Sequence, residues 1–196
     1  MLPMPIPAII LAAGASRRLG QPKQLVRVGS ETLLDRTIRV AHEAGFEPIF
    51  VVLGALKELI SSTAKLDFVQ VINNDDWHLG ISTSIHAGIR AILNLTLPPP
   101  SVLILVCDQP RLSAKHLLNL MAERPSGTAE IIVASKYAQV LGIPAIFPAS
   151  QFPELMKLEG DQGAKTLLRT SNSPLSFVPF PDGEIDIDLP SDLSNL

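Results

Sequence analysis

Apolar segments of strand length alternate with segments of helical pattern along the first two thirds of the chain. Between them, apolar side chains recur every three to four residues, as in segments 33–41 and 117–121. Strands that are apolar on both faces must be covered on both faces, so the pattern predicts an α/β fold with a doubly wound, mostly parallel sheet. The five predicted strands are Ala8–Ala12, Ile49–Leu53, Phe68–Ile72, Val102–Cys107 and Ile131–Ala134.

This alternation becomes irregular after Ala138, where prolines are spread through short segments. We expect the last third to form a lobe that caps the sheet. Pro98-Pro99-Pro100 and Pro125-Ser126-Gly127 are each expected to end a helix before the next strand. A chain of 196 residues with 46% apolar content can bury one substantial core, which predicts a single domain over residues 1–196.

Charge and cysteine content exclude several classes of protein. A net charge of −3 provides no broad basic surface, so nucleic acid is not an expected partner. The single cysteine, Cys107, rules out an internal disulfide, and the four histidines have no zinc-motif spacing. No basic residue precedes the apolar segment Ala8–Ala13, and no apolar run is long enough to span a membrane. We therefore expect a cytoplasmic protein without membrane contact.

The first predicted strand leads into a turn of small residues that is followed by three cations. The turn is Ala12–Ser16, and the cations are Arg17, Arg18 and Lys23. Small residues let backbone N–H groups approach an anion, and the cations neutralise its charge, so the segment predicts a polyphosphate site. It has neither the G-x-x-x-x-G-K-[ST] nor the G-x-G-x-x-G spacing. The alternative is an ordinary strand-to-helix turn whose cations face solvent.

A carboxylate follows the fourth predicted strand, in Cys107-Asp108-Gln109-Pro110. Ligands of open α/β sheets bind at the carboxyl ends of the strands, and Mg²⁺ prefers carboxylate and phosphate oxygens. Asp108 is therefore the first candidate metal ligand. Its alternative role is to cap the helix expected near Ser113, although Pro110 intervenes.

Two further carboxylates alternate with isoleucines near the end of the chain. Alternation places Asp186 and Asp188 on one face, and we expect Asp188 to complete the metal site. The alternative is a solvated edge strand, with Asp192 beginning a helix after Pro190.

Hydroxyl groups and a glycine gather where a helix is expected to begin after the third strand. Gly80, Ser82 and Ser84 could contact the base and ribose of a nucleotide there, with Trp77 as a packing anchor. The alternative is that Ser82 only caps the helix.

Together these motifs resemble the molybdenum cofactor cytidylyltransferases and their near relatives, the MobA-like nucleotidyltransferases. The resemblance extends over almost the whole chain, with departures at Leu19, Gln139 and Leu189. Ala12-Ala13-Gly14 resembles the CTP-using branch, since GTP-using relatives tend to have Gly at the third position of that motif. The motifs are L-A-A-G…K-Q-L, N…W…G-x-S-x-S, C-D-Q-P, G-x-P-A-x-F, G-D-x-G-A and D-I-D-x-P.

The resemblance implies a Rossmann-like nucleotidyltransferase fold and transfer of CMP from CTP to the phosphate of molybdenum-molybdopterin, with release of pyrophosphate and Mg²⁺ as cofactor. It implies catalytic roles for Arg18, Lys23 and Asp108, with Asp108 and Asp188 as metal ligands. Residues 1–110 would mainly bind the nucleotide, and 136–196 would form the acceptor side. The nucleotide-binding residues would be Leu11, Ala12, Ala13, Gly14, Lys23, Gly80, Ser82 and Ser84, and the acceptor-binding residues Gly142, Pro144, Gly163 and Lys165.

Delivery of such a product implies docking to an apo molybdenum hydroxylase. Two alternatives stay open. One is a transferase of the same fold with another phosphate acceptor, such as a sugar or alditol phosphate. The other is a non-catalytic chaperone for cofactor insertion, which would bind its ligands without releasing pyrophosphate.

Overall fold

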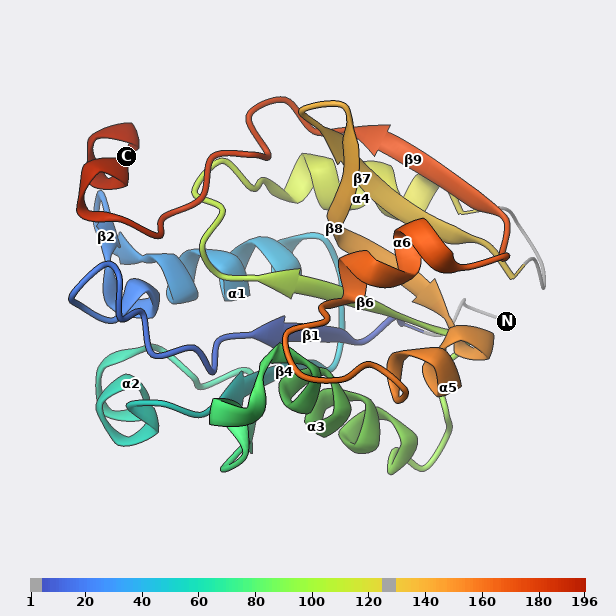
Figure 1. Ribbon diagram of the computed structural model, residues 1–196, viewed down its shortest axis with the longest axis horizontal. Helices are drawn as coiled ribbons and strands as arrows, with labels where there is room; N and C mark the ends of the chain where they lie inside the picture. Colours follow the sequence, from blue (N-terminus) through green and yellow to red (C-terminus); the bar gives the residue numbers. More distant parts are fainter. Residues whose placement is uncertain (1–4, 125–129) are drawn as a thin grey trace.

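A seven-stranded sheet with helices on both faces forms the centre of the molecule (Figure 1). The structure is a computed structural model that describes residues 5–124 and 130–196. The strand order is β5-β4-β1-β6-β8-β7-β9, and β8 is antiparallel to both of its neighbours. The strands are β1 (Ala8–Leu11), β4 (Ile49–Leu53), β5 (Gln70–Asn73), β6 (Ser101–Val106), β7 (Ile132–Tyr137), β8 (Val140–Pro148) and β9 (Leu175–Pro179).

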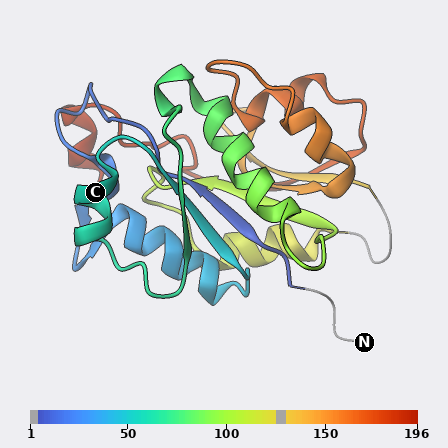
Figure 2. The same ribbon diagram turned by 90° about the horizontal axis from the view of Figure 1, so that it is seen from below.

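Alternate side chains of the strands enter two separate cores. Ala8 and Ile10 of β1 face the layer of α1 (Leu33–Glu43) and α4 (Ala114–Ala122). Ile9 and Leu11 face the opposite layer, which contains α3 (Ile81–Leu93), α5 (Phe152–Leu155) and α6 (Leu167–Thr170). Figure 2 shows the two helical layers on opposite sides of the sheet. The expected α/β fold, with a mostly parallel sheet covered on both faces, is confirmed.

Helices α1 and α4 begin where a side chain satisfies one of their first backbone N–H groups. Thr32 Oγ1 accepts a hydrogen bond from Asp35 N at the start of α1, and Ser113 Oγ accepts one from His116 N at the start of α4. The remaining elements are α2 (Lys57–Thr63), α3 (Ile81–Leu93), α5 (Phe152–Leu155), α6 (Leu167–Thr170), the hairpin β2 (Arg27–Val28) and β3 (Glu31–Thr32), and the 3-10 turns Lys23–Leu25, Trp77–Leu79, Ala149–Gln151, Ala164–Thr166 and Pro190–Asn195.

The last third of the chain differs from the expected capping lobe, because its strands extend the central sheet. β8 pairs with β6, although it contains Pro144, which has no N–H group to donate. A register shift between Ala134 and Ser135 leaves Pro144 outside the pairing with β7. The edge strand β9 lies between Pro174 and Pro181.

Two smaller expectations concern the third strand and one turn. The third strand begins at Gln70 rather than at Phe68, whose side chain is 79% exposed. The turn expected at Pro125-Ser126-Gly127 lies outside the described residues.

Within residues 5–124 and 130–196, no helix combines the length and the apolar character that crossing a membrane requires.

A buried histidine makes stability depend on pH. His116 stacks on Phe180 with ring centroids 4.3 Å apart, and its Nε2 lies 2.8 Å from Ser135 Oγ. Burial lowers the pKa of His116 from 6.5 to about 4. Below pH 6.5 the unfolded chain takes up a proton on His116 that the folded protein excludes. The contribution of His116 to the free energy of unfolding is therefore fully present above pH 6.5 and is lost as the pH falls towards 4.

We expect the free energy of unfolding to fall by about 3 kcal/mol between pH 6.5 and pH 4 because of His116, since one pKa unit corresponds to 1.36 kcal/mol. Urea unfolding at several pH values measures it. In His116→Gln, which keeps a hydrogen-bond donor for Ser135, the corresponding part of the pH dependence should disappear. An identical pH dependence in both proteins would contradict the assignment.

Candidate functional site

The candidate site lies at the carboxyl ends of the parallel strands, where segments distant in sequence meet. The loop of residues 12–22 follows β1, residues 74–80 follow β5, and Asp108 follows β6. In Figure 1, this edge also receives the C-terminal segment that follows β9. This is the edge at which open α/β sheets bind ligands.

A buried glutamine fixes the loop after β1. Gln24 is 1% exposed, and its Nε2 donates to the carbonyl oxygens of Ala12 (2.8 Å) and Gly14 (2.9 Å). Ser16, at φ 51°, accepts a hydrogen bond from Lys23 N on its Oγ. The loop is therefore ordered by side-chain contacts, and only a short 3-10 turn, Lys23–Leu25, follows it.

Lys23 joins two carboxylates that are far apart in sequence. Its Nζ lies 2.5 Å from Asp108 Oδ2 and 2.8 Å from Asp188 Oδ1. Arg18, which is more exposed, contacts the other oxygen of Asp188 at 2.7 Å. These four side chains, Arg18, Lys23, Asp108 and Asp188, form two cations against two carboxylates, and we name them the charge cluster.

Burial and mutual attraction shape the protonation of the charge cluster. Burial alone would lower the pKa of Lys23, but Asp108 and Asp188 outweigh it and raise that pKa well above its usual range. Burial would raise the pKa of Asp188, yet hydrogen bonds from Lys23 and Arg18 lower it. Among the described residues, Asp186 has no such partner, and burial together with Asp108 and Asp188 raises its pKa. At neutral pH, Lys23 is therefore protonated and Asp188 is ionised.

The C-terminal segment is held in place by an apolar anchor and a cap. Ile187 is fully buried against Leu19, Val26 and Leu33, and its N–H donates to the carbonyl oxygen of Asp108. Asp192 Oδ2 accepts hydrogen bonds from the N–H groups of residues 188 and 189. This leaves the carboxylate of Asp188 free to contact Lys23. Segment 184–189 is not a strand, so the edge strand and the alternation expected for Asp186 and Asp188 are both wrong. A 3-10 turn does begin at Pro190, with Asp192 as its cap.

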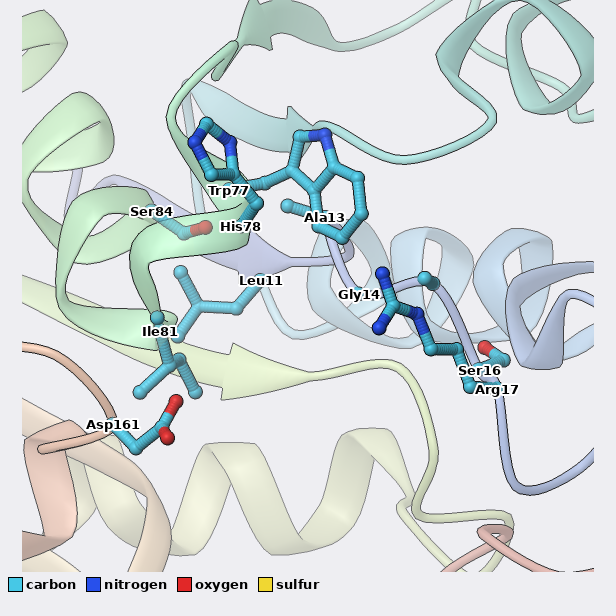
Figure 3. A pocket seen from close by; sticks show the side chains of 12 residues that line it. Leu11, Ala13, Gly14, Ser16, Arg17, Trp77, His78, Ile81, Ser84 and Asp161 are labelled. Carbon is cyan, nitrogen blue, oxygen red and sulfur yellow. The ribbon is translucent and has the colours of Figure 1, made fainter.

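A first cavity of about 400 Å³ opens beside the loop (Figure 3). Arg17 lies on one side of it, and Asp161 and Ile81 lie on the other. The first cavity is lined by Leu11, Ala13, Gly14, Ala15, Ser16, Arg17, Trp77, His78, Gly80, Ile81, Ser84 and Asp161. Ser16 and Arg17 also line a smaller hollow of about 190 Å³, and Lys23 and Asp188 are part of the lining of that hollow.

Gly80 allows two segments to pack closely at this cavity. A Cβ at Gly80 would lie 2.2 Å from the carbonyl carbon of Gly160, and Gly80 has φ 115°. Gly80 is also the N-cap of α3, so the proposal that Ser82 caps this helix is wrong. The N–H of Ser82 donates to the Gly160 carbonyl, and Ser84 Oγ accepts from buried Asn74.

A second cavity of about 400 Å³ has Asp108 in its lining. Gln109 is 6% exposed, its Nε2 donates to the carbonyls of Ile143 and Gly183, and its Oε1 has no partner among the described residues. Lys165 Nζ lies 5.8 Å from the centroid of the Tyr137 ring. The second cavity is lined by Val106, Asp108, Gln109, Tyr137, Ala138, Val140, Ile143, Lys165, Gly183, Glu184 and Asp186.

The sequence-predicted acceptor residues differ in their relation to this cavity. Lys165 lines it, whereas Gly142 and Pro144 lie behind its lining. A Cβ at Gly142 would approach Tyr137 Oη to 2.1 Å, and the Pro144 carbonyl accepts from Ser135 Oγ. Gly163 packs near Ile81 instead.

Several lining residues were missed by the sequence analysis. Asp161 and His78 line the first cavity, and Gln109 and Tyr137 line the second. Arg17, one of the three predicted cations, also lines the first cavity. Asp161 and Gln109 both lie inside motifs that the resemblance used, so only their individual positions were missed. Of the expected nucleotide residues, Leu11, Ala13, Gly14, Gly80 and Ser84 line the first cavity, whereas Ala12, Ser82 and Lys23 do not.

The charge cluster offers two carboxylates to a cation. Asp108 does not cap α4, because Ser113 does, so its carboxylate faces Lys23 instead. Mg²⁺ commonly takes one or two protein carboxylates and completes its coordination with substrate phosphates and water. Among the described residues, no group of three or more histidine, cysteine or acidic side chains could hold a metal by itself. The residues present therefore fit a metal that a phosphate-bearing ligand helps to coordinate.

Gln24 provides the test of how the loop is ordered. Gln24→Ala leaves the buried carbonyls of Ala12 and Gly14 without their side-chain donor, so we expect a loss of about 1–3 kcal/mol in unfolding free energy. Urea unfolding measures it. The exposed residue Gln162 provides a control, since its alanine variant should lose less than about 0.5 kcal/mol. Equal losses would show that Gln24 does not order the loop.

Residues 8–175 match the family described as MobA-like NTP transferase domain. Nicotine blue oxidoreductase of Paenarthrobacter nicotinovorans is 29% identical over 170 residues, which cover 84% of this chain and 81% of that protein. Purine catabolism protein PucB of Bacillus subtilis is 26% identical over 200 residues, with 94% and 92% covered. Molybdenum cofactor cytidylyltransferase of Escherichia coli is 33% identical over only 87 residues, 44% of this chain and 45% of that protein.

Solved structures extend the likeness to the whole fold. The crystal structure of a Mycobacterium tuberculosis Rv0371c homologue from Mycobacterium sp. strain JC1 has a TM-score of 0.84 and 28% identity, covering 97% of this chain and 93% of that chain. Rv0371c of Mycobacterium tuberculosis in complex with manganese has a TM-score of 0.79 and 27% identity, covering 98% of each chain. The chain has the nucleotidyltransferase fold, and it belongs to the MobA-like NTP transferase domain family.

Proposed function

We propose that this protein transfers CMP from CTP to the phosphate of a molybdenum-molybdopterin acceptor and releases pyrophosphate. The observation that carries the proposal is Lys23, whose ammonium group is shared by Asp108 and Asp188 directly beside the small-residue loop. A cation and two carboxylates at such a loop fit phosphoryl chemistry, which depends on positioning and charge neutralisation.

The loop and the charge cluster have separate tasks in this proposal. The backbone of Ala13 and Gly14 approaches the triphosphate, and Gly80 and Ser84 form the wall that faces the nucleoside, with Ser82 buried beside them. The remaining nucleotide-binding residues in this proposal are Leu11 and Ala12. Arg18 and Lys23 neutralise the triphosphate and the departing pyrophosphate. An acceptor phosphate is already ionised, so it attacks the α-phosphorus without a general base.

We propose Asp108 and Asp188 as ligands of a divalent cation, Mg²⁺ in the working enzyme. The cation would supply charge neutralisation at the phosphates. The manganese complex of Rv0371c supports a divalent metal in a relative of similar structure. Lys23 occupies the space between the two carboxylates, so its ammonium must give way when they bind a cation.

We propose the second cavity as the acceptor site, with residues 1–110 mainly binding the nucleotide and 136–196 forming the acceptor side. Lys165 can contact an anionic group there, and Tyr137 offers a ring face. Gly142 and Pro144 support the cavity wall from behind, and Gly163 precedes the 3-10 turn that carries Lys165. Gln109 Oε1, which lacks a protein partner among the described residues, suits an acceptor that carries N–H or O–H groups.

The partial match to the Escherichia coli molybdenum cofactor cytidylyltransferase favours this acceptor. A product of this kind would be delivered to an apo molybdenum hydroxylase. A transferase acting on a sugar or alditol phosphate is the nearest rival, because the same charge cluster would serve it. The relatives also include a protein named as an oxidoreductase, so family membership alone does not fix the acceptor.

Pyrophosphate release tests the proposal directly. We expect release only when CTP and metal-loaded molybdopterin are both present with Mg²⁺, and not with GTP or ATP. Release with CTP and a sugar phosphate, but not with molybdopterin, would assign a different acceptor. CTP binding without turnover with any of these acceptors would favour a cofactor-insertion chaperone.

Lys23→Gln tests the role of the charge cluster in the same assay. The amide keeps hydrogen-bond donors for the carboxylates but removes the positive charge, so turnover should fall about 100-fold or more while the protein stays folded. Thermal unfolding monitors the fold. Lys157, an exposed lysine paired with Glu154, is the matched control, and its glutamine variant should keep full turnover. Near-normal turnover in Lys23→Gln would contradict the assignment.

A further inference from the structure

The first cavity carries opposite charges on its two sides. Figure 3 shows Arg17 near Ser16 and Gly14 on one side, and the carboxylate of Asp161 near Ile81 on the other. Asp161 belongs to the motif Gly160–Lys165, which the sequence analysis gave to the acceptor side. Only Lys165 of this motif lines the second cavity, whereas Asp161 lines the first.

The backbone around Asp161 is held against the start of α3. The Gly160 carbonyl accepts a hydrogen bond from Ser82 N at 3.1 Å, and no side chain at residue 80 separates the two segments. A turn follows, in which Gln162 N donates to the Glu159 carbonyl at 3.0 Å. Asp161 itself has no hydrogen bond or ion pair with any described residue. Its carboxylate is therefore presented to the cavity and is available to a ligand.

The two charges define how a nucleotide must lie. This step rests on the proposed function, in which the triphosphate lies against the backbone of Ala13 and Gly14. A carboxylate repels phosphates, so the triphosphate belongs beside Arg17 and the nucleoside extends towards Asp161. A carboxylate accepts hydrogen bonds and cannot donate them. The group of the nucleoside that meets Asp161 must therefore be a donor.

We propose that Asp161 selects the base by accepting a hydrogen bond from its exocyclic amino group, N4 of cytosine in CTP. Acidic side chains pair with this group in nucleic-acid recognition as well. Uracil has a carbonyl oxygen, O4, at the same position. Two acceptors facing one another repel, so Asp161 favours CTP over UTP, which is otherwise of nearly the same size and shape.

Asp161→Asn tests the proposal because the amide presents both an acceptor and a donor. Equilibrium binding of CTP, UTP and 2′-deoxy-CTP is measured by calorimetry with Mg²⁺ and without any acceptor. We expect the wild-type preference for CTP over UTP to fall by about tenfold or more in the variant. The preference for CTP over 2′-deoxy-CTP should not change. Glu159→Gln is the matched control, since it removes a nearby exposed charge outside the cavity lining and should leave both preferences as they are.

The possible results separate this inference from the proposed function. An unchanged CTP-to-UTP preference in Asp161→Asn would overturn the inference while leaving CTP binding intact. If Asp161→Asn lost only the preference for CTP over 2′-deoxy-CTP, the inference would also be overturned, because Asp161 would then contact the ribose. Absence of binding of any of these nucleotides to the wild-type protein would instead contradict the proposed function.

Discussion

The shared contact of Lys23 with Asp108 and Asp188 is the interaction on which the site depends. It joins the loop after β1, the end of β6 and the C-terminal segment, which are separated by 85 and 165 residues from Lys23. None of these segments is a regular helix or strand at the point of contact. Burial of Ile187 brings the last segment to the loop, and the ion pairs then fix the side chains. Packing and electrostatics thus act on the same short stretch of chain.

This arrangement separates the two cavities and gives each a distinct character. The first is bounded by the small-residue loop and the beginning of α3, and the second by Tyr137, Lys165 and the segment after β9. Asp108 lines the second cavity, and Asp188 lines the smaller hollow that shares Ser16 and Arg17 with the first cavity. A reaction that joins two phosphate-bearing ligands needs both ligands beside one set of charges. The single segment 160–165 contributes to both cavities, with Asp161 in the lining of the first and Lys165 in that of the second.

Local patterns predicted much of this structure, and long-range contacts account for what they missed. β1, β4 and β6 are largely apolar segments, and the loop and Asp108 were predicted from their positions at strand ends. Asp188 was predicted from an alternating strand that the structure does not contain, and it reaches Lys23 because Ile187 is buried beside the loop. β8 was not predicted, because pairing beyond Pro144 depends on a register shift in its neighbour β7. The position of Asp161 depends on the close approach of Gly80 and Gly160, 80 residues apart in the sequence. Contacts between segments that are distant in the chain leave no periodic pattern in the sequence.

We propose that Lys23 and a divalent cation share the same two carboxylates, and Mn²⁺ binding to the nucleotide-free protein tests this. Electron paramagnetic resonance measures the free ion during titration of the wild-type protein, Lys23→Gln and the control Lys157→Gln. Because removing a positive charge beside two carboxylates strengthens cation binding, we expect Lys23→Gln to bind Mn²⁺ about tenfold tighter or more than the other two proteins. Equal or weaker Mn²⁺ binding by Lys23→Gln would contradict the account.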